Sequence, residues 1–298
     1  MQTLVVILGP TGVGKTDLCI DIANHLGCEI INCDSRQFFR EIPIGTAAPT
    51  AEQQQQVRHY FVGNLSVDDY YSASEYEQDV LKFLQTQDKN ANFVLTGGSM
   101  MYLDAVCNGI DCMPAVEEPI RNKLKIRLEE EGLDALLAEL HELDPIHWNI
   151  VDKRNPRRIL HALEICYQTG KPYSSFMRQE KPKRPFRVIK IGLTRPRAEL
   201  FERINQRVLK MMDSGLEEEA RKVWYKKGLN SLNTVGYKEL FAYFDGEITK
   251  DEAIRQIQSN SRHYMKKQET WFKRDKDIKW FHPKEYKEII NYIDISLY

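Results

Sequence analysis

The stretch TLVVILGPTGVGKT, residues 3–16, decides the fold of this chain. Its first six residues form a continuous apolar and β-branched run, which is typical of a strand buried on both faces of a parallel sheet. The next eight residues, from Gly9 to Thr16, fit the pattern G-x-x-x-x-G-K-[ST]. A helix is expected from about Lys15 to Leu26, because apolar residues recur there at intervals of four. The order strand, glycine-rich loop, helix predicts the start of a βαβ unit.

This loop predicts a phosphate site. Glycines let backbone N–H groups turn toward phosphate oxygens, and the helix N-terminus adds positive potential. Lys15 supplies a point charge, and the Thr16 hydroxyl is a candidate Mg²⁺ ligand. A tight turn without a ligand is the weaker interpretation, because strand and helix flank the motif as a P-loop requires. The predicted phosphate-binding residues are Gly9, Thr11, Gly12, Gly14, Lys15 and Thr16.

The rest of the chain predicts an α/β protein with a P-loop NTPase-like parallel-sheet core and an inserted helical domain. Further strands are expected at 29–33, 93–96 and 187–193, with a helix at 74–86. Helical patterns then cover 119–131, 133–143 and 156–167, with breaks at Gly132, Asp144-Pro145 and Gly170. A mostly helical tail spans 198–274, where Leu200, Ile204, Val208 and Met211 form one stripe. We expect a catalytic core at 1–115 and 185–298, and a helical insertion at 116–184.

Composition excludes several classes of protein. The chain has 298 residues, is 42% hydrophobic and carries a net charge of -1, which rules out disorder and a uniformly basic nucleic-acid coat protein. Charge is nevertheless clustered: residues 153–187 hold ten Lys/Arg against two acids, and residues 262–276 hold six against two, with three aromatics interleaved. Basic and aromatic residues together suit a single-stranded RNA loop, although a solvated helix face is the plain alternative.

The cysteines and the apolar runs give expectations about location. The six cysteines, at 19, 28, 33, 107, 112 and 166, form no CxxC pair and have no His at zinc-ligand spacing, so we expect small buried side chains in a reducing compartment. No run approaches the roughly 18 apolar residues of a membrane helix, and the first apolar run is too short for a signal peptide. We therefore expect a cytoplasmic protein, a monomer, with no membrane partner.

The ends of the predicted strands argue against a standard ATPase. Such enzymes usually place a metal-binding carboxylate after a second apolar strand, but residues 93–96 run into Gly97-Gly98. Only the strand at 29–33 ends in an acid, Asp34. The loop is therefore suited to a diphosphate that leaves as well as to a γ-phosphate that moves. By itself, Asp34 favours catalysis at the sheet edge, with a turn or a helix N-cap as the alternative.

Six sequence blocks, in order, carry a resemblance to a known family. They are Asp34-Ser35-Arg36-Gln37, Ile44-Gly45-Thr46-Ala47, Gly97-Gly98-Ser99-Met100-Met101-Tyr102, Asn155-Pro156-Arg157-Arg158 with Ala162-Leu163-Glu164, Val235-Gly236-Tyr237, and Lys267-Gln268-Glu269-Thr270-Trp271-Phe272. Together with the P-loop they resemble the tRNA dimethylallyltransferases, which prenylate adenosine 37 beside the anticodon. The likeness extends to about Arg274. The sequence departs from the family at Ser99-Met100-Met101, where Thr-Gly-Leu is usual, and at Ala48, where Lys is usual.

The resemblance implies a role for each matching residue. Asp34 matches the base that acts on the adenine N6, and Ser99 a hydroxyl near the reacting centre. Lys15 and Thr16 match the residues that hold dimethylallyl diphosphate and its Mg²⁺, and Arg203 and Arg207 lie in a region on the diphosphate side. The residues implied to contact the tRNA anticodon loop are Asp34, Ser35, Arg36, Gln37, Ser99, Arg121, Arg157, Arg158, Ile159, Leu160, His161, Lys267, Gln268 and Trp271.

The chemistry of these residues agrees with prenyl transfer. The adenine amine is a poor nucleophile that needs a positioned base, and a departing diphosphate needs cations. The target base must leave the anticodon stack to reach Asp34. Met100 and Met101 are candidates for an apolar wall around the prenyl tail, with core packing as the plain alternative. Two other functions stay open: a P-loop kinase of a small molecule or nucleotide, and a non-catalytic RNA-binding protein switched by nucleotide.

Overall fold

The computed structural model describes residues 1–111, 113–177 and 182–297. Cys112 and three charged residues of the predicted basic stretch, Arg178, Glu180 and Lys181, lie outside them. The chain divides into two compact units, one formed by Met1–Asn108 with Lys183–Tyr298 and the other by Gly109–Pro182. The second unit starts earlier than the predicted residue 116, because helix α5 ends at Asn108 and Gly109 turns the backbone with a φ of 84°.

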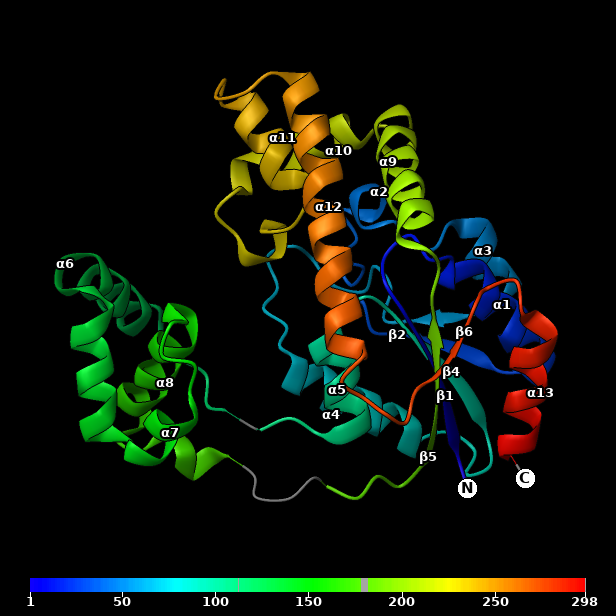
Figure 1. Cartoon of the computed structure of the whole chain (residues 1–298), viewed down its shortest axis with the longest axis horizontal. Helices are drawn as coiled ribbons and strands as arrows, with labels where there is room; N and C mark the ends of the chain where they lie inside the picture. The colour runs from blue at the N-terminus through cyan, green and yellow to red at the C-terminus, as the bar shows by residue number, and fades with distance from the viewer. Residues whose placement is uncertain (112, 178–181, 298) are drawn as a thin grey trace. The chain divides into compact units, whose positions relative to one another are not determined.

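A six-stranded parallel sheet forms the centre of the first unit, in the order β3-β2-β4-β1-β5-β6 (Figure 1). The four predicted strands are present as β1 (Thr3–Leu8), β2 (Glu29–Asn32), β4 (Asn92–Thr96) and β5 (Arg187–Leu193). The prediction missed β3 (His59–Tyr60) and β6 (Lys279–Phe281), which are edge strands too short for an apolar pattern. The α/β fold class is confirmed.

Helices cover both faces of this sheet, and the alternation of β1 decides which residues meet them. Val5 and Ile7 belong to a buried cluster with residues of α1 and α13, whereas Leu4, Val6 and Leu8 belong to a second cluster with residues of α4 and α5. The helices of this unit are α1 (Lys15–Leu26), α2 (Pro43–Thr46), α3 (Ala51–Gln56), α4 (Ala73–Gln85), α5 (Met100–Asn108), α9 (Arg197–Asp213), α10 (Leu216–Val223), α11 (Tyr237–Phe244), α12 (Lys250–Phe272) and α13 (Tyr286–Leu297), with 3₁₀ turns η2 (Trp224–Lys226) and η3 (Asn230–Leu232).

The second unit contains helices and no strand among its described residues. It consists of α6 (Glu118–Leu143), α7 (Pro145–Ile150), α8 (Pro156–Thr169) and the 3₁₀ turn η1 (Tyr173–Phe176). As predicted, Gly132 interrupts α6, with φ 81° and ψ 174°. Asp144-Pro145 does more than end a helix: the Asp144 carboxylate accepts a hydrogen bond from the His147 N–H at 2.9 Å and starts α7, which the prediction missed.

Several smaller expectations can be compared with the structure. Leu200, Ile204 and Val208 are buried as one stripe of α9, while Met211 is only partly buried near its end. Among the described cysteines, Cys19, Cys33, Cys107 and Cys166 are buried free thiols and Cys28 is half-buried. Within residues 1–111, 113–177 and 182–297, no helix has the length and apolar character needed to cross a bilayer.

Candidate active site

The phosphate-binding loop, residues 9–16, connects β1 to α1 at the carboxyl edge of the sheet. Gly9, Gly12 and Gly14 have φ values of 149°, 80° and 99°, and Gly14 is the N-cap of α1. A Cβ on Gly9 would lie 2.7 Å from the Leu193 carbonyl oxygen, so neighbouring strand β5 leaves room only for glycine. The glycines of the motif therefore allow the backbone conformation that a phosphate-binding loop requires.

The ammonium group of Lys15 lies over this loop. Its Nζ donates hydrogen bonds to the carbonyl oxygens of Gly9 at 2.9 Å and Pro10 at 3.1 Å. Burial, and then the charge of Arg207, lower the pKa of Lys15 to about 8, while Asp34 opposes the shift. Lys15 is thus a cation whose charge a diphosphate would stabilise.

Three arginines line the loop from outside. Arg203 Nε donates to the Gly12 carbonyl oxygen at 2.7 Å, and Arg207 Nη1 donates to the Thr11 hydroxyl at 3.1 Å. Burial lowers the pKa of Arg207, and Asp34 acts against that shift. The third is Arg195, whose Nε donates to the Val13 carbonyl oxygen at 2.8 Å.

Sequence reasoning missed Arg195, although a signal was present. It comes two residues after β5, which is hydrogen-bonded to β1. Residues that follow neighbouring parallel strands meet at one edge of the sheet. Arg195 is also ion-paired with Glu199 on α9, so its guanidinium is held on both sides.

The other predicted half of the site is the acceptor segment, residues 34–37, which follows β2. One oxygen of Asp34 accepts the Arg36 N–H at 3.1 Å, so Asp34 does form the local turn that was its alternative interpretation. Its other oxygen accepts the Gly98 N–H at 3.2 Å. The Ser99 hydroxyl accepts the Ser35 N–H at 2.8 Å and shares a second hydrogen bond with the Ser35 hydroxyl. The predicted pair Asp34 and Ser99 therefore lies together.

Gln268 connects the phosphate-binding loop to this segment. Its Oε1 accepts the Thr11 N–H at 2.8 Å and its Nε2 donates to the Gly98 carbonyl oxygen at 2.8 Å, which also accepts the Tyr264 hydroxyl at 2.9 Å. Its exposed fraction is 0%. The tRNA contact that the resemblance implies for Gln268 is therefore a correction, because its side chain is buried and both of its polar atoms bond within the protein. Gln268 instead connects Thr11 to Gly98, whose N–H bonds the Asp34 carboxylate.

Arg36 and Gln37 point their side chains toward other parts of the first unit. Arg36 Nη1 donates to the carbonyl oxygens of Asn230 at 2.9 Å and Ser231 at 3.1 Å. Gln37 Nε2 donates to the carbonyl oxygens of Thr46 and Ala47, both at 3.0 Å. These bonds orient both side chains without help from a ligand.

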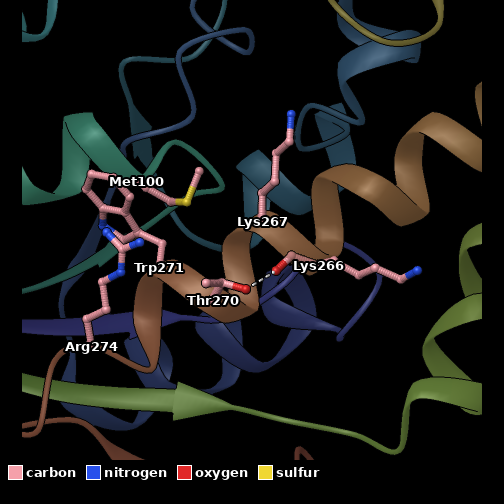
Figure 2. Close-up of a pocket in the computed structure, with 6 residues that line it drawn as sticks. All are labelled: Met100, Lys266, Lys267, Thr270, Trp271 and Arg274. Carbon is pink, nitrogen blue, oxygen red and sulfur yellow. Dashed lines mark hydrogen bonds between the residues drawn. The ribbon is translucent and has the colours of Figure 1, made fainter. Parts of the chain in front are cut away.

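A pocket of about 400 Å³ lies beside α12 (Figure 2). Its lining combines three cations with apolar surface, from Met100, Lys266, Lys267, Thr270, Trp271 and Arg274. The ring centroid of Trp271 lies 5.6 Å from the guanidinium carbon of Arg274. Of the predicted apolar wall, Met100 is partly buried here, whereas Met101 is 56% exposed.

The predicted tRNA-contact residues of the second unit differ in exposure. Arg157, Arg158 and His161 are exposed on α8, and Arg121 on α6 is partly exposed. Ile159 is a correction: its exposed fraction is 0%, because it faces the core of this unit with Leu163, so its side chain has no surface to offer RNA. Leu160 is partly buried against the same core.

The fold and this geometry define an α/β enzyme with a P-loop-like core, in which a glycine-rich loop follows β1 and the Asp34 carboxylate follows β2, with β4 between the two strands. The particular family follows from comparison: residues 37–275 match the family described as IPP transferase, and the chain belongs to that family. It is therefore a prenyltransferase, as the resemblance indicated.

Comparison with individual relatives supports the same family. The chain is 56% identical over 297 residues to a tRNA dimethylallyltransferase 1 of Bacteroides fragilis, covering 99% of each chain, and 58% identical to one of Phocaeicola vulgatus, covering 98% of each. Among solved structures, it is similar to the tRNA isopentenylpyrophosphate transferase of Bacillus halodurans, with TM-score 0.72, 33% identity, and 100% and 97% of the two chains covered. A eukaryotic dimethylallyltransferase described as acting on tRNA shares the fold, with TM-score 0.79, 23% identity, and 95% and 74% coverage.

Proposed function

We propose that this chain transfers the dimethylallyl group from dimethylallyl diphosphate to N6 of adenosine 37 in tRNA and releases diphosphate. The observation that carries this proposal is the hydrogen-bonded path from Thr11 through Gln268 and Gly98 to Asp34. It puts a carboxylate beside a phosphate-binding loop, as amine alkylation by an allylic diphosphate requires. The names of the relatives supply the substrates, and the geometry is compatible with both.

The phosphate-binding loop acts on the leaving group. As the allylic C–O bond breaks, its electron pair stays on the diphosphate, whose charge increases. Lys15, the loop N–H groups, and Arg203 and Arg207 stabilise that charge more in the transition state than in the ground state. Arg195 contributes by holding the backbone of Val13.

A magnesium ion would bind at this site together with the diphosphate, which supplies some of its ligands. Such a shared site needs few protein ligands, and among the described residues no three His, Cys, Asp or Glu side chains gather to hold a metal ion. Thr16, partly exposed in the first turn of α1, would supply a hydroxyl ligand, with diphosphate oxygens and water as the others. When bound, the ion would neutralise charge on the leaving group.

The acceptor segment acts on the amine. The lone pair of N6 is delocalised into the adenine ring, so attack on the allylic carbon is assisted when a base takes an N6 proton. Asp34 takes that proton as the C–N bond forms, and the electrons of the N–H bond remain on nitrogen. Ser99 holds the turn that carries Asp34, through its two bonds to Ser35.

The RNA reaches the site as a single-stranded loop whose target base is flipped out. Trp271 offers an indole face in a pocket with Lys267 and Arg274, a combination suited to a stacked base with its phosphates. The exposed Arg157 and Arg158 add phosphate contacts from the helical unit. We further infer that the protein acts as a monomer, since one chain contains both halves of the site. We also infer that it acts in the cytoplasm, where its tRNA substrate is found.

Product analysis tests this proposal. Purified protein is incubated with dimethylallyl diphosphate, Mg²⁺ and a tRNA that has adenosines at 36 and 37, and the RNA is digested and analysed by mass spectrometry. We expect N6-dimethylallyladenosine at position 37, and no product when adenosine 37 is replaced by guanosine. A parallel incubation with ATP tests the kinase alternative. ATP turnover without any prenylated nucleoside would reject the proposal.

A further inference from the structure

A buried carboxylate that the proposed mechanism does not use holds the loop next to Gln37. Glu219 on α10 is 7% exposed, and its two oxygens accept the N–H groups of Ile44 at 2.8 Å and Gly45 at 2.9 Å. A carboxylate buried this deeply is costly unless it is fully hydrogen-bonded. Its bonds go to residues 42–47, a segment far from α10 in the sequence.

Tyr237 on α11 also holds residues 42–47 in place. Its hydroxyl donates to Glu219 at 2.5 Å and to the Ile42 carbonyl oxygen at 3.2 Å. Burial, and then the charge of Glu219, raise the pKa of Tyr237, so the hydroxyl stays protonated and remains a donor. A Cβ on Gly45 would lie 2.6 Å from the Cζ of Tyr237, so only glycine allows this contact.

The other end of the same segment fixes Gln37. The carbonyl oxygens of Thr46 and Ala47 both accept from Gln37 Nε2 at 3.0 Å. Ala47 has a φ of 49°, an uncommon left-handed conformation for a residue other than glycine. Because both partners are acceptors, the amide cannot be turned around: the nitrogen faces Thr46 and Ala47, and Oε1 is the atom left for a ligand.

We propose that Glu219 is a positioning residue for base recognition: by holding residues 42–47 it orients Gln37 so that Gln37 Oε1 accepts a hydrogen bond from the exocyclic amine of the target base. This inference rests on the proposed function, and it deepens it by specifying the atom and its polarity. An acceptor at this point favours a base that presents an N–H donor and disfavours a base that presents none.

Binding of RNA without catalysis tests the inference. The probes are two anticodon stem-loop RNAs, one with adenosine and one with unsubstituted purine at position 37, titrated by fluorescence anisotropy in the absence of dimethylallyl diphosphate. We expect the wild-type protein to prefer the adenosine RNA by about 5- to 10-fold, the usual effect of one hydrogen bond. Gln37→Met should abolish the preference, since Met has a similar shape and no carbonyl oxygen.

A double-mutant cycle separates positioning from general destabilisation. Glu219→Gln puts an amide N–H against an N–H or hydroxyl donor, so it should reduce the preference to within about twofold and add almost nothing in the Gln37→Met background. Glu218→Gln, an exposed neighbour on α10, is the matched control and should keep the full preference. The affinity for dimethylallyl diphosphate should stay within about twofold in all variants.

Two results would overturn the inference. The first is that Glu219→Gln weakens the binding of both RNAs equally, and the second is that it weakens binding by the same factor with and without the Gln37 amide. Either outcome would give Glu219 a structural role only. If Glu219→Gln does not fold, Tyr237→Phe takes its place, because it removes one hydroxyl and leaves the carboxylate on Ile44 and Gly45. Failure of the proposed function is recognised separately, by an absent prenylated product from wild-type protein.

Discussion

The two halves of the site are built in different ways. The phosphate-binding loop is encoded by one continuous motif, in which Lys15 donates to carbonyl oxygens five and six residues earlier in the chain. Distant side chains, such as those of Gln268 and Arg203, add hydrogen bonds to a loop that the motif already specifies. The acceptor segment takes its shape from distant residues, because Asp34 is held by Gly98, Arg36 by Asn230, and Gln37 by Thr46. A local motif can bind a diphosphate in many proteins, whereas we propose that the distant contacts shape the acceptor segment for a base in RNA.

The largest effect should come from Lys15→Met. It removes a cation that contacts the leaving group, so kcat/KM for dimethylallyl diphosphate should fall by about 10²- to 10³-fold. The affinity for tRNA should change little, because the acceptor segment keeps its own contacts. Steady-state kinetics and filter binding measure the two quantities. A parallel loss of tRNA affinity would show that the two halves are not separable.

Gln268→Leu should affect both halves at once. It leaves the Thr11 N–H without its partner and removes one donor from the Gly98 carbonyl oxygen, which should cost about 1–3 kcal/mol in the free energy of unfolding. We expect kcat/KM to fall by about 10- to 100-fold for each substrate, consistent with a misplacement of reacting groups. Lys267→Gln is the neighbouring control and should leave the diphosphate kinetics intact. Denaturant unfolding and steady-state kinetics compare Gln268→Leu with Lys267→Gln. If Gln268→Leu affected the kinetics of only one substrate, the claim that Gln268 connects the two halves of the site would be contradicted.

Trp271→Ala should weaken RNA binding alone. Loss of a stacking platform costs about 1–3 kcal/mol per base, so the dissociation constant for the anticodon stem-loop should rise by about tenfold or more. Trp271→Phe keeps an aromatic face and should recover part of the loss. KM for dimethylallyl diphosphate should be unaffected in both variants. If Trp271→Phe and Trp271→Ala lost the same affinity for the stem-loop, base stacking on Trp271 would be contradicted.

A dependence on pH should appear on the diphosphate side. Lys15 has a lowered pKa of about 8, so it is charged below that pH and increasingly neutral above it. KM for dimethylallyl diphosphate should therefore rise above pH 8, reaching about tenfold at pH 9, while tRNA affinity at constant ionic strength stays flatter. Lys15→Arg should move the rise to higher pH. A flat KM up to pH 9.5 would show that the charge of Lys15 is not needed.

Sequence alone predicted the local structure of the phosphate-binding loop and its flanking elements well, because the signals for that structure are local. The bounds of β1 and α1 and the conformations of the loop glycines follow from consecutive residues. Arg195 was missed because its signal, a position two residues after β5, has meaning only once the pairing of β5 with β1 is known. The short edge strands β3 and β6 escaped because two or three residues show no period.

The second half depended on resemblance, since its contacts join remote parts of the chain. Nothing near Gln268 indicates that its amide bonds both Thr11 and Gly98, more than 150 residues away. Likewise, the resemblance placed Ile159 in a tRNA-contact segment beside exposed arginines, but its packing in one core with residues of α6 shows that its side chain is buried. The roles of the acceptor segment and of the exposed arginines stay predictions until kinetics test them.

The most direct test of the central claim is the single-turnover rate of Asp34→Asn. With saturating dimethylallyl diphosphate and tRNA, prenylation by this variant should be slower by about 10²- to 10⁴-fold, because the base is gone. The amide has the same shape and its oxygen keeps one of the two backbone hydrogen bonds of Asp34, from Arg36 or from Gly98. Affinities for both substrates should stay within about threefold of the wild-type values. A variant that binds both substrates and prenylates adenosine 37 at the wild-type rate would contradict the account.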